Sequence, residues 1–136
     1  MEVLNTVVPE PSAAVEFFTA PEDGPFVMVN LLRFRPLAAY PDGRDAHLTG
    51  REAYDRYAVV VRSLIEGLGG RVVYSGAVTG LLLGQVEDLW DAVGLVEYPS
   101  LEAFRSMIVS PEMQAVEHHR VAGLAGQLNI RTKPQR

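Results

Sequence analysis

The sequence contains no cysteine among its 136 residues. Disulfide bonds, thiolate catalysis and cysteine-ligated metal sites are therefore excluded. Lysine is almost absent as well, because eleven of the twelve basic residues are arginine and the single lysine, Lys133, lies in the C-terminal tail. The body of the chain therefore offers no lysine for Schiff-base chemistry or for a phosphate-binding P-loop.

Long apolar runs and an excess of positive charge are also missing. No run approaches the ~20 residues that span a bilayer, and the N-terminus lacks the basic and apolar regions of a signal peptide, so a cytoplasmic protein without a membrane partner is expected. Seventeen acidic residues against twelve basic ones give a net charge of −5, the wrong sign for a general nucleic-acid binder. The length predicts one domain over residues 1–136, with a core at about 25–131.

The hydrophobic pattern predicts strands and helices in a recognisable order. The clearest strand covers Phe26–Arg35, and a capping box at Thr49 and Glu52 opens a helix that reaches about Leu68. The remaining expected elements are strands over Arg71–Leu83 and Trp90–Tyr98, two short helices that start after Ser100 and at Ser110, and a last strand over Gly126–Arg131. This β-α-β-β-α-β order predicts a ferredoxin-like α+β fold, a four-stranded antiparallel sheet with its helices on one face.

Apolar residues occupy both faces of the first strand. Phe26, Met28, Leu32 and Phe34 alternate with Val27, Val29 and Leu31. A sheet covered on one side only should instead alternate apolar with polar residues. The helices can cover one face, so a second copy of the sheet is expected over the other, which predicts a homodimer.

Several segments resemble a known family. They are Val29–Phe34, Gly50–Tyr54, Gly69–Arg71, Glu97–Phe104, Ser110–Glu112 and His119–Gly123. From about Phe26 to Arg131 the sequence is similar to a bacterial family of uncharacterised proteins, a "domain of unknown function" of the dimeric α/β-barrel superfamily. The resemblance implies a ferredoxin-like protomer whose sheet pairs face to face with its twin. It implies no reaction, since the superfamily includes cofactor-free monooxygenases, haem-degrading enzymes, isomerases and ligand-sensing domains.

Asn30 is the most informative single position, because its amide lies in the apolar row of Phe26, Met28 and Leu32. A buried amide without a hydrogen bond costs about 1–3 kcal/mol. Two interpretations remain open. The amide either bonds a loop or a helix end, or it lines a pocket between the sheet and the helices.

His118 and His119 are adjacent and therefore cannot chelate one metal ion as residues four apart on a helix would, so no metal site is expected. The helical spacing of Val116, His119 and Ala122 predicts that His119 faces inward and His118 faces solvent. His119 would then be a general base or an orienting donor beside Asn30, or a core histidine bonded to a carbonyl group.

Arg120 closes the second short helix, where a cation suits the helix dipole; alternatively it clamps a carboxylate or phenolate ligand. Tyr54 and Tyr57 stand one helical turn apart and Trp90 starts a strand. These aromatic residues form either the core or the wall of a ligand pocket. Arg33 and Glu97 are expected in ion pairs at the dimer seam.

Two functions follow as hypotheses. One is the binding of a small aromatic or anionic molecule in a cavity between sheet and helices, with Tyr54, Tyr57, Trp90 and Arg120 as ligand-binding residues. The other is a cofactor-free or haem-degrading-type monooxygenase that uses Asn30 and His119. Haem-degrading barrels use a similar Asn, Trp and His trio, although Trp90 stands earlier in its strand than theirs. No cofactor is predicted, haem is the alternative, and the question of catalysis stays open.

Overall fold

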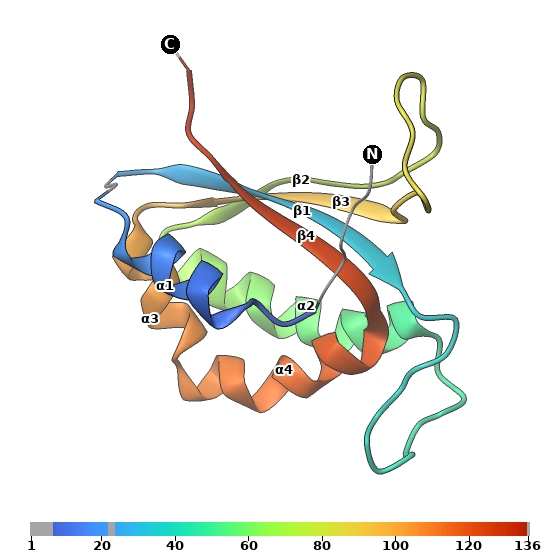
Figure 1. The fold of residues 1–136 in the computed structure, drawn as a ribbon. Helices are drawn as coiled ribbons and strands as arrows, with labels where there is room; N and C mark the ends of the chain where they lie inside the picture. Colours follow the sequence, from blue (N-terminus) through green and yellow to red (C-terminus); the bar gives the residue numbers. More distant parts are fainter. Residues whose placement is uncertain (1–6, 22–23, 136) are drawn as a thin grey trace.

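The computed structural model describes residues 7–21 and 24–135. Its strands are β1 (Phe26–Phe34), β2 (Arg71–Ala77), β3 (Ala92–Tyr98) and β4 (Leu124–Thr132), and its helices are α1 (Pro11–Thr19), α2 (Gly50–Gly67), α3 (Leu101–Ile108) and α4 (Pro111–Gly123). The strands form one antiparallel sheet in the order β2-β3-β1-β4. All four helices lie on one side of this sheet (Figure 1). This is the predicted ferredoxin-like α+β fold.

Local capping determines where three of the helices begin. At α2 the Thr49 hydroxyl accepts a hydrogen bond from the Glu52 amide at 3.1 Å, and the Glu52 carboxylate accepts one from the Thr49 amide at 2.9 Å. Ser100 caps α3, and Ser110 caps α4 immediately before Pro111. These side chains satisfy amide groups that have no partner within the helix, so the predicted helix starts are confirmed.

The predicted bounds of β2 and β3 are wrong at the turn that joins them. β2 ends at Ala77 and not at Leu83, and β3 begins at Ala92 and not at Trp90. Just beyond the two strands, the Val78 amide donates a hydrogen bond to the Asp91 carbonyl at 2.9 Å. Beyond it the chain forms a loop that contains Gly84 at a φ of 97°. The leucines of this loop resemble strand residues in sequence, but they lack a partner strand within the described chain.

The helix-covered face of the sheet carries the core. Phe26 and Met28 of β1 are buried together with Ile65 of α2, Phe104 of α3 and Met113 of α4. Within residues 7–21 and 24–135, no helix is both long and apolar enough to cross a membrane.

The opposite face of the sheet is apolar but has no helix over it (Figure 1). Val29 lies between Leu95 of β3 and Ile130 of β4, and the next row on this face places Leu31 between Val93 and Leu128. Ile130 is 46% exposed and the β1 valines are only half-buried. Apolar residues therefore do occupy both faces, as the strand pattern indicates.

Two ion pairs involve residues that were expected at a dimer seam. Glu97 pairs with Arg71 across β2 and β3 at 3.4 Å. Arg33 pairs with Asp88 of the β2–β3 loop at 3.0 Å. Both pairs form within one chain and are partly exposed, so each contributes little stability by itself.

The start of α2 and the end of α4 meet through two glycines. A Cβ atom at Gly123 would overlap the Gly50 carbonyl oxygen and lie 2.8 Å from the Tyr54 amide nitrogen. The Gly50 amide donates to the Arg35 carbonyl at 3.1 Å, and the Arg35 amide donates to the Gly123 carbonyl at 2.9 Å. The end of β1 therefore ties the two helices together at their point of closest approach.

We expect Gly123→Ala to lower the free energy of unfolding by about 2 kcal/mol, because the added methyl group forces the two helix backbones apart. Thermal and urea unfolding would measure this loss. Gly67→Ala is the matched control, since it adds a methyl group to α2 with nothing within 4 Å and should stabilise the helix slightly. An unfolding free energy of Gly123→Ala equal to that of the unmodified protein would show that the contact is not tight.

Candidate functional site

A cavity of about 730 Å³ lies between the sheet and the helices. This volume falls within the ~300–1,000 Å³ of typical small-molecule sites. Strands supply its floor through residues such as Met28 and Asn30, α2 covers it with Tyr54 and Tyr57, and α4 contributes Arg120. Asn30 and the two tyrosines therefore line one cavity on the helix-covered side of the sheet.

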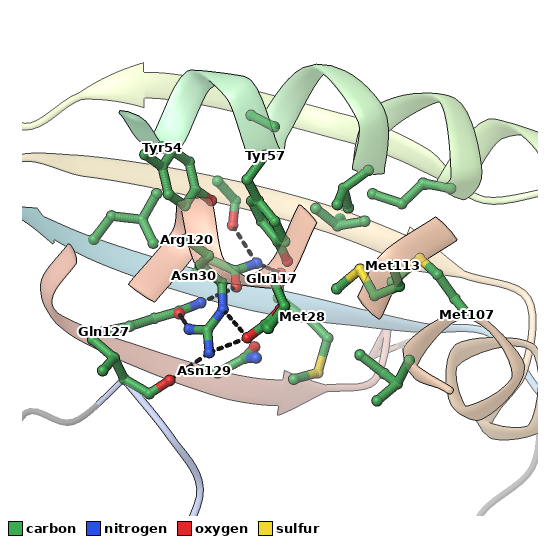
Figure 2. A pocket seen from close by; sticks show the side chains of 18 of the residues that line it. Met28, Asn30, Tyr54, Tyr57, Met107, Met113, Glu117, Arg120, Gln127 and Asn129 are labelled. Atoms are coloured by element: carbon green, nitrogen blue, oxygen red, sulfur yellow. Dashed lines mark hydrogen bonds and ion pairs between the residues drawn. The ribbon is translucent and has the colours of Figure 1, made fainter. Parts of the chain in front are cut away.

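The two ends of the cavity differ in chemistry (Figure 2). We define the polar end as Asn30, Tyr54, Tyr57, Glu117, Arg120 and Gln127, and the apolar end as Met28, Ile65, Phe104, Met107 and Met113. Methionine side chains are flexible and polarisable, so the apolar end can adapt to the shape of a bound molecule. The polar end is held by hydrogen bonds.

A directed chain of hydrogen bonds crosses the polar end. Arg120 donates from Nη1 to the Gln127 Oε1 at 2.8 Å, and the Gln127 Nε2 donates to the Asn30 Oδ1 at 3.0 Å. A guanidinium group can only donate, so its bond orients the Gln127 amide and, through it, the amide of Asn30. The Asn30 Nδ2 then contacts the Gly94 and Met28 carbonyls at 3.3 and 3.5 Å. Asn30 thus has backbone partners and also lines the cavity.

Arg120 lies in the last turn of α4, but its side chain points into the cavity and is only 12% exposed. Its Nε donates to Glu117 at 2.7 Å, and its Nη2 contacts the same carboxylate oxygen at 2.5 Å. Nη2 also donates to the Val7 carbonyl. The positive charge is therefore balanced by Glu117 inside the cavity, and few of its N–H groups remain for a ligand.

Tyr54 and Tyr57 present their hydroxyl groups to the polar end (Figure 2). Among the described residues neither hydroxyl has a hydrogen-bond partner. Burial raises the pKa of Tyr54 to about 12, against a smaller lowering by Arg120. Burial raises the pKa of Tyr57 as well, with a further contribution from Tyr54. Both phenols therefore keep their protons at neutral pH and act as hydrogen-bond donors.

The N-terminal segment closes one side of the cavity. Val7, Val8, Pro9 and Glu10 line it, as do residues of α1. No residue of α1 is fully buried, and the helix packs chiefly through two phenylalanines whose ring centroids lie 5.8 Å from that of Phe104. This role of the N-terminal segment was not predicted from the sequence.

His119 does not lie in the cavity. Its Nδ1 is 2.6 Å from the hydroxyl of Tyr40, a buried residue of the loop between β1 and α2, and its ring lies tilted by 39° against that of His118 with the centroids 3.9 Å apart. Burial lowers the pKa of His119, and the neighbouring His118 lowers it further. The predicted convergence of His119 with Asn30 is therefore wrong. The hydrogen-bond partner of His119 is the phenol of Tyr40 and not the backbone carbonyl that was the alternative expectation.

Trp90 is also outside the residues that line the cavity. It precedes β3 in the segment where the Asp91 amide donates to the Leu32 carbonyl and the Asp91 carboxylate accepts from the Phe34 amide, both at 2.8 Å. The expected trio of Asn30, Trp90 and His119 therefore does not assemble. Within the described part of the chain, no group of three histidine, aspartate or glutamate residues could hold a metal ion.

Glu117 and Gln127 are polar cavity residues that the sequence analysis missed. Met113, Glu117 and Arg120 follow the helical spacing of four and three residues, which marks the face of α4 that looks into the cavity. Gln127 and Asn129 alternate along β4, on the side that pairs with Leu32 and Asn30. Both patterns were present in the sequence.

The family described as "Domain of unknown function (DUF1330)" matches residues 44–131 of this chain. A protein of unknown function from Rhodopseudomonas palustris, whose crystal structure is known, is 37% identical with a TM-score of 0.89. That match covers 98% of this chain and 99% of the other. No protein among those with curated functions matches the sequence.

More distant structures share the fold alone. A protein from Arabidopsis thaliana is 21% identical with a TM-score of 0.55, over 82% of this chain and 96% of that one. A dimeric protein of unknown function with a ferredoxin-like fold, from Bacteroides fragilis NCTC 9343, is 10% identical with a TM-score of 0.51, over 81% and 96%.

The raised pKa of Tyr54 leads to an expected pH dependence of stability. Because the folded pKa of about 12 exceeds the ordinary tyrosine value of 10.0, the stabilising contribution is complete below pH 10 and is lost as the pH rises through 10 to 12. Between pH 9 and 11 the loss for Tyr54 alone should be about 1 kcal/mol. Tyr54→Phe should therefore lose less stability over this range than the unmodified protein.

Urea unfolding of both proteins at pH 7, 9 and 11 would measure this difference. At pH 7 the two should be nearly equal, because the hydroxyl has no partner among the described residues. A Tyr54→Phe protein with the same decline in stability between pH 9 and 11 would contradict the burial of the phenol.

Proposed function

The chain belongs to the family described as "Domain of unknown function (DUF1330)", and we propose that it binds a small organic molecule, aromatic or anionic, in the cavity between its sheet and its helices. The observation that carries this proposal is the pair of phenol hydroxyls of Tyr54 and Tyr57, which face the cavity without a partner among the described residues. Hydroxyl groups that face a cavity without a protein partner are open to water or to a bound molecule, and a ligand with a hydrogen-bond acceptor could take their hydrogens.

The apolar end supports an aromatic or other flat apolar body. Met28, Met107 and Met113 are each at most 4% exposed, and Phe104 lies beside them in the same cluster. Thioether groups make favourable contacts with aromatic rings. An aromatic molecule would therefore gain dispersion contacts at this end while its polar group reaches the tyrosines.

An anionic group would depend on Arg120. This arginine is the cation of the polar end, but Glu117 and Gln127 already occupy much of its donor capacity. A carboxylate ligand would have to displace Glu117 or share the guanidinium with it. The aromatic alternative requires no such rearrangement.

A monooxygenase would have to use the same cavity with a different set of residues. None of the three histidines, His47, His118 and His119, lines it. His119 is therefore not placed to act there as a base, and no histidine is placed there to hold a haem. Ligand binding is the function that the geometry supports better.

We further propose that two copies of the chain pair through the uncovered face of the sheet. The apolar rows around Val29 and Leu31 support this, and so does the β2–β3 loop, which rises on the same side of the sheet (Figure 1). Leu82 in this loop is fully exposed and Leu83 is 85% exposed. Large exposed apolar patches mark interaction surfaces, and the Bacteroides fragilis protein of similar fold is described as dimeric.

Filling the cavity should prevent ligand binding. Gly94 faces Asn30 across β1 and β3, lines the cavity, and has nothing within 4 Å of an added Cβ atom. We expect Gly94→Leu to weaken binding of the fluorescent apolar probe N-phenyl-1-naphthylamine by about tenfold or more, a loss of about 1.4 kcal/mol, with an unchanged or higher melting temperature. Fluorescence titration would measure it.

Gly80→Leu is the matched control for this experiment. Gly80 also has open space around it, but it lies in the β2–β3 loop outside the cavity. Equal probe binding by both variants and the unmodified protein, or no binding at all, would contradict the proposed site.

A charge on the uncovered face should separate the two copies. Val29→Asp places a carboxylate among Leu95 and Ile130, where an unpaired charge buried in an interface is strongly destabilising. Light scattering on a size-exclusion column should give twice the 14.9 kDa chain mass for the unmodified protein and the single-chain mass for the variant. Val59→Asp, at a 73% exposed position of α2, should remain dimeric. A dimeric Val29→Asp protein would show that another surface forms the contact.

A further inference from the structure

We infer that the ligand of this cavity is a neutral carbonyl compound with an apolar body, whose carbonyl oxygen accepts hydrogen bonds from Tyr54 and Tyr57. This inference rests on the proposed function and narrows its two alternatives to one class of molecule. Ketones, esters, lactones and quinones share the chemistry concerned.

The balance of charge in the cavity lining favours a neutral ligand. Among the described residues, three arginines and three carboxylates line the cavity, namely Arg51, Arg62 and Arg120 with Glu10, Asp55 and Glu117. The lining therefore carries no surplus of positive charge. At the polar end itself, Arg120 and Glu117 form a close ion pair. A buried carboxylate requires an available cation, and the polar end does not offer one.

The hydrogen-bond donors of the polar end favour a ligand that carries an acceptor. The hydroxyls of Tyr54 and Tyr57 have no partner among the described residues, and their raised pKa values keep both protonated. The Asn30 amide nitrogen has only the long contacts of 3.3 and 3.5 Å to backbone carbonyls. Its orientation follows from the chain that begins at Arg120, and its N–H groups are directed at those carbonyls, so the two phenols and not this amide are the open donors of the polar end.

The balanced charge of the lining and the two open phenol donors together favour a ligand with a neutral hydrogen-bond acceptor. A carbonyl oxygen can accept two hydrogen bonds, which matches two phenol donors. It carries no charge that burial would penalise. A hydrocarbon of the same shape would leave both hydroxyls without partners, and a site with buried polar groups discriminates strongly against such a ligand.

The apolar end of the cavity offers a place for the apolar body of the ligand. The cavity continues from the tyrosines to Met107 and Met113 (Figure 2), so a ligand with its carbonyl group at the polar end would lie with its apolar body against the methionines. Their flexibility would allow different bodies to be accepted, while the hydrogen-bonded polar end selects the functional group.

Three size-matched naphthalenes test the inference on the unmodified protein. They are 2-acetylnaphthalene, which is a neutral ketone, 2-naphthoate, which is the corresponding carboxylate, and 2-ethylnaphthalene, which lacks the oxygen. Displacement of N-phenyl-1-naphthylamine would rank their affinities. We expect the ketone to bind about tenfold or more tightly than either of the others, a difference of about 1.4 kcal/mol.

The double variant Tyr54→Phe/Tyr57→Phe identifies the donors. It should fold with a nearly unchanged melting temperature, because the lost hydroxyls have no partner among the described residues. In it the ketone should bind no better than 2-ethylnaphthalene, whose own affinity should not fall. The infrared carbonyl band of the bound ketone, at lower frequency than in an apolar solvent, should shift back in the variant.

These measurements distinguish a failure of the carbonyl inference from a failure of the proposed binding function. Tightest binding of 2-naphthoate, with loss of that binding in Arg120→Gln, would overturn the carbonyl inference and leave the proposed binding function in place. Equal binding of the ketone and 2-ethylnaphthalene would also overturn it. If the probe binds but Gly94→Leu does not weaken it, the proposed function itself fails.

Discussion

The backbone contact between Gly50 and Gly123 is the constraint from which the rest of the site follows. It brings the first turn of α2 and the last turn of α4 together, and the two hydrogen bonds of Arg35 hold both to the end of β1. Tyr54 comes one turn after Gly50, and Arg120 comes one turn before Gly123. The same contact therefore places the phenol and the guanidinium group at one end of the cavity.

The hydrogen-bond network of the polar end is organised by the guanidinium group of Arg120. Because Arg120 can only donate hydrogen bonds, it fixes the direction of the chain through Gln127 to Asn30. Its charge is balanced at once by Glu117. A site of this kind is ordered before a ligand arrives, which reduces the entropy that binding would cost. The methionines at the other end are not constrained in this way, so selectivity and adaptability are separated in space.

Much of the fold was predictable because its signals are local. The helix starts are marked by capping hydrogen bonds between residues three apart, at Thr49 and Glu52, at Ser100 and at Ser110. Asn30 was identified because an amide in an apolar row is conspicuous in any strand. The error at His119 has an equally local origin. The spacing of Val116 and Ala122 was taken to mark the face toward the cavity, whereas a second packed cluster around Tyr40 lies against that side of α4.

By itself, the sequence determined the order of strands and helices, the apolar character of both sheet faces, and the presence of Asn30, Tyr54 and Tyr57 on the helix-covered side. These properties depend on periodicity and capping, which act within a few residues. Only the tertiary structure decided that Arg120 reaches Gln127 of β4, that His119 turns to Tyr40, and that Val7 reaches the cavity. The reason is physical: each of these contacts joins segments whose relative position depends on how the helices pack, and no local pattern encodes that packing.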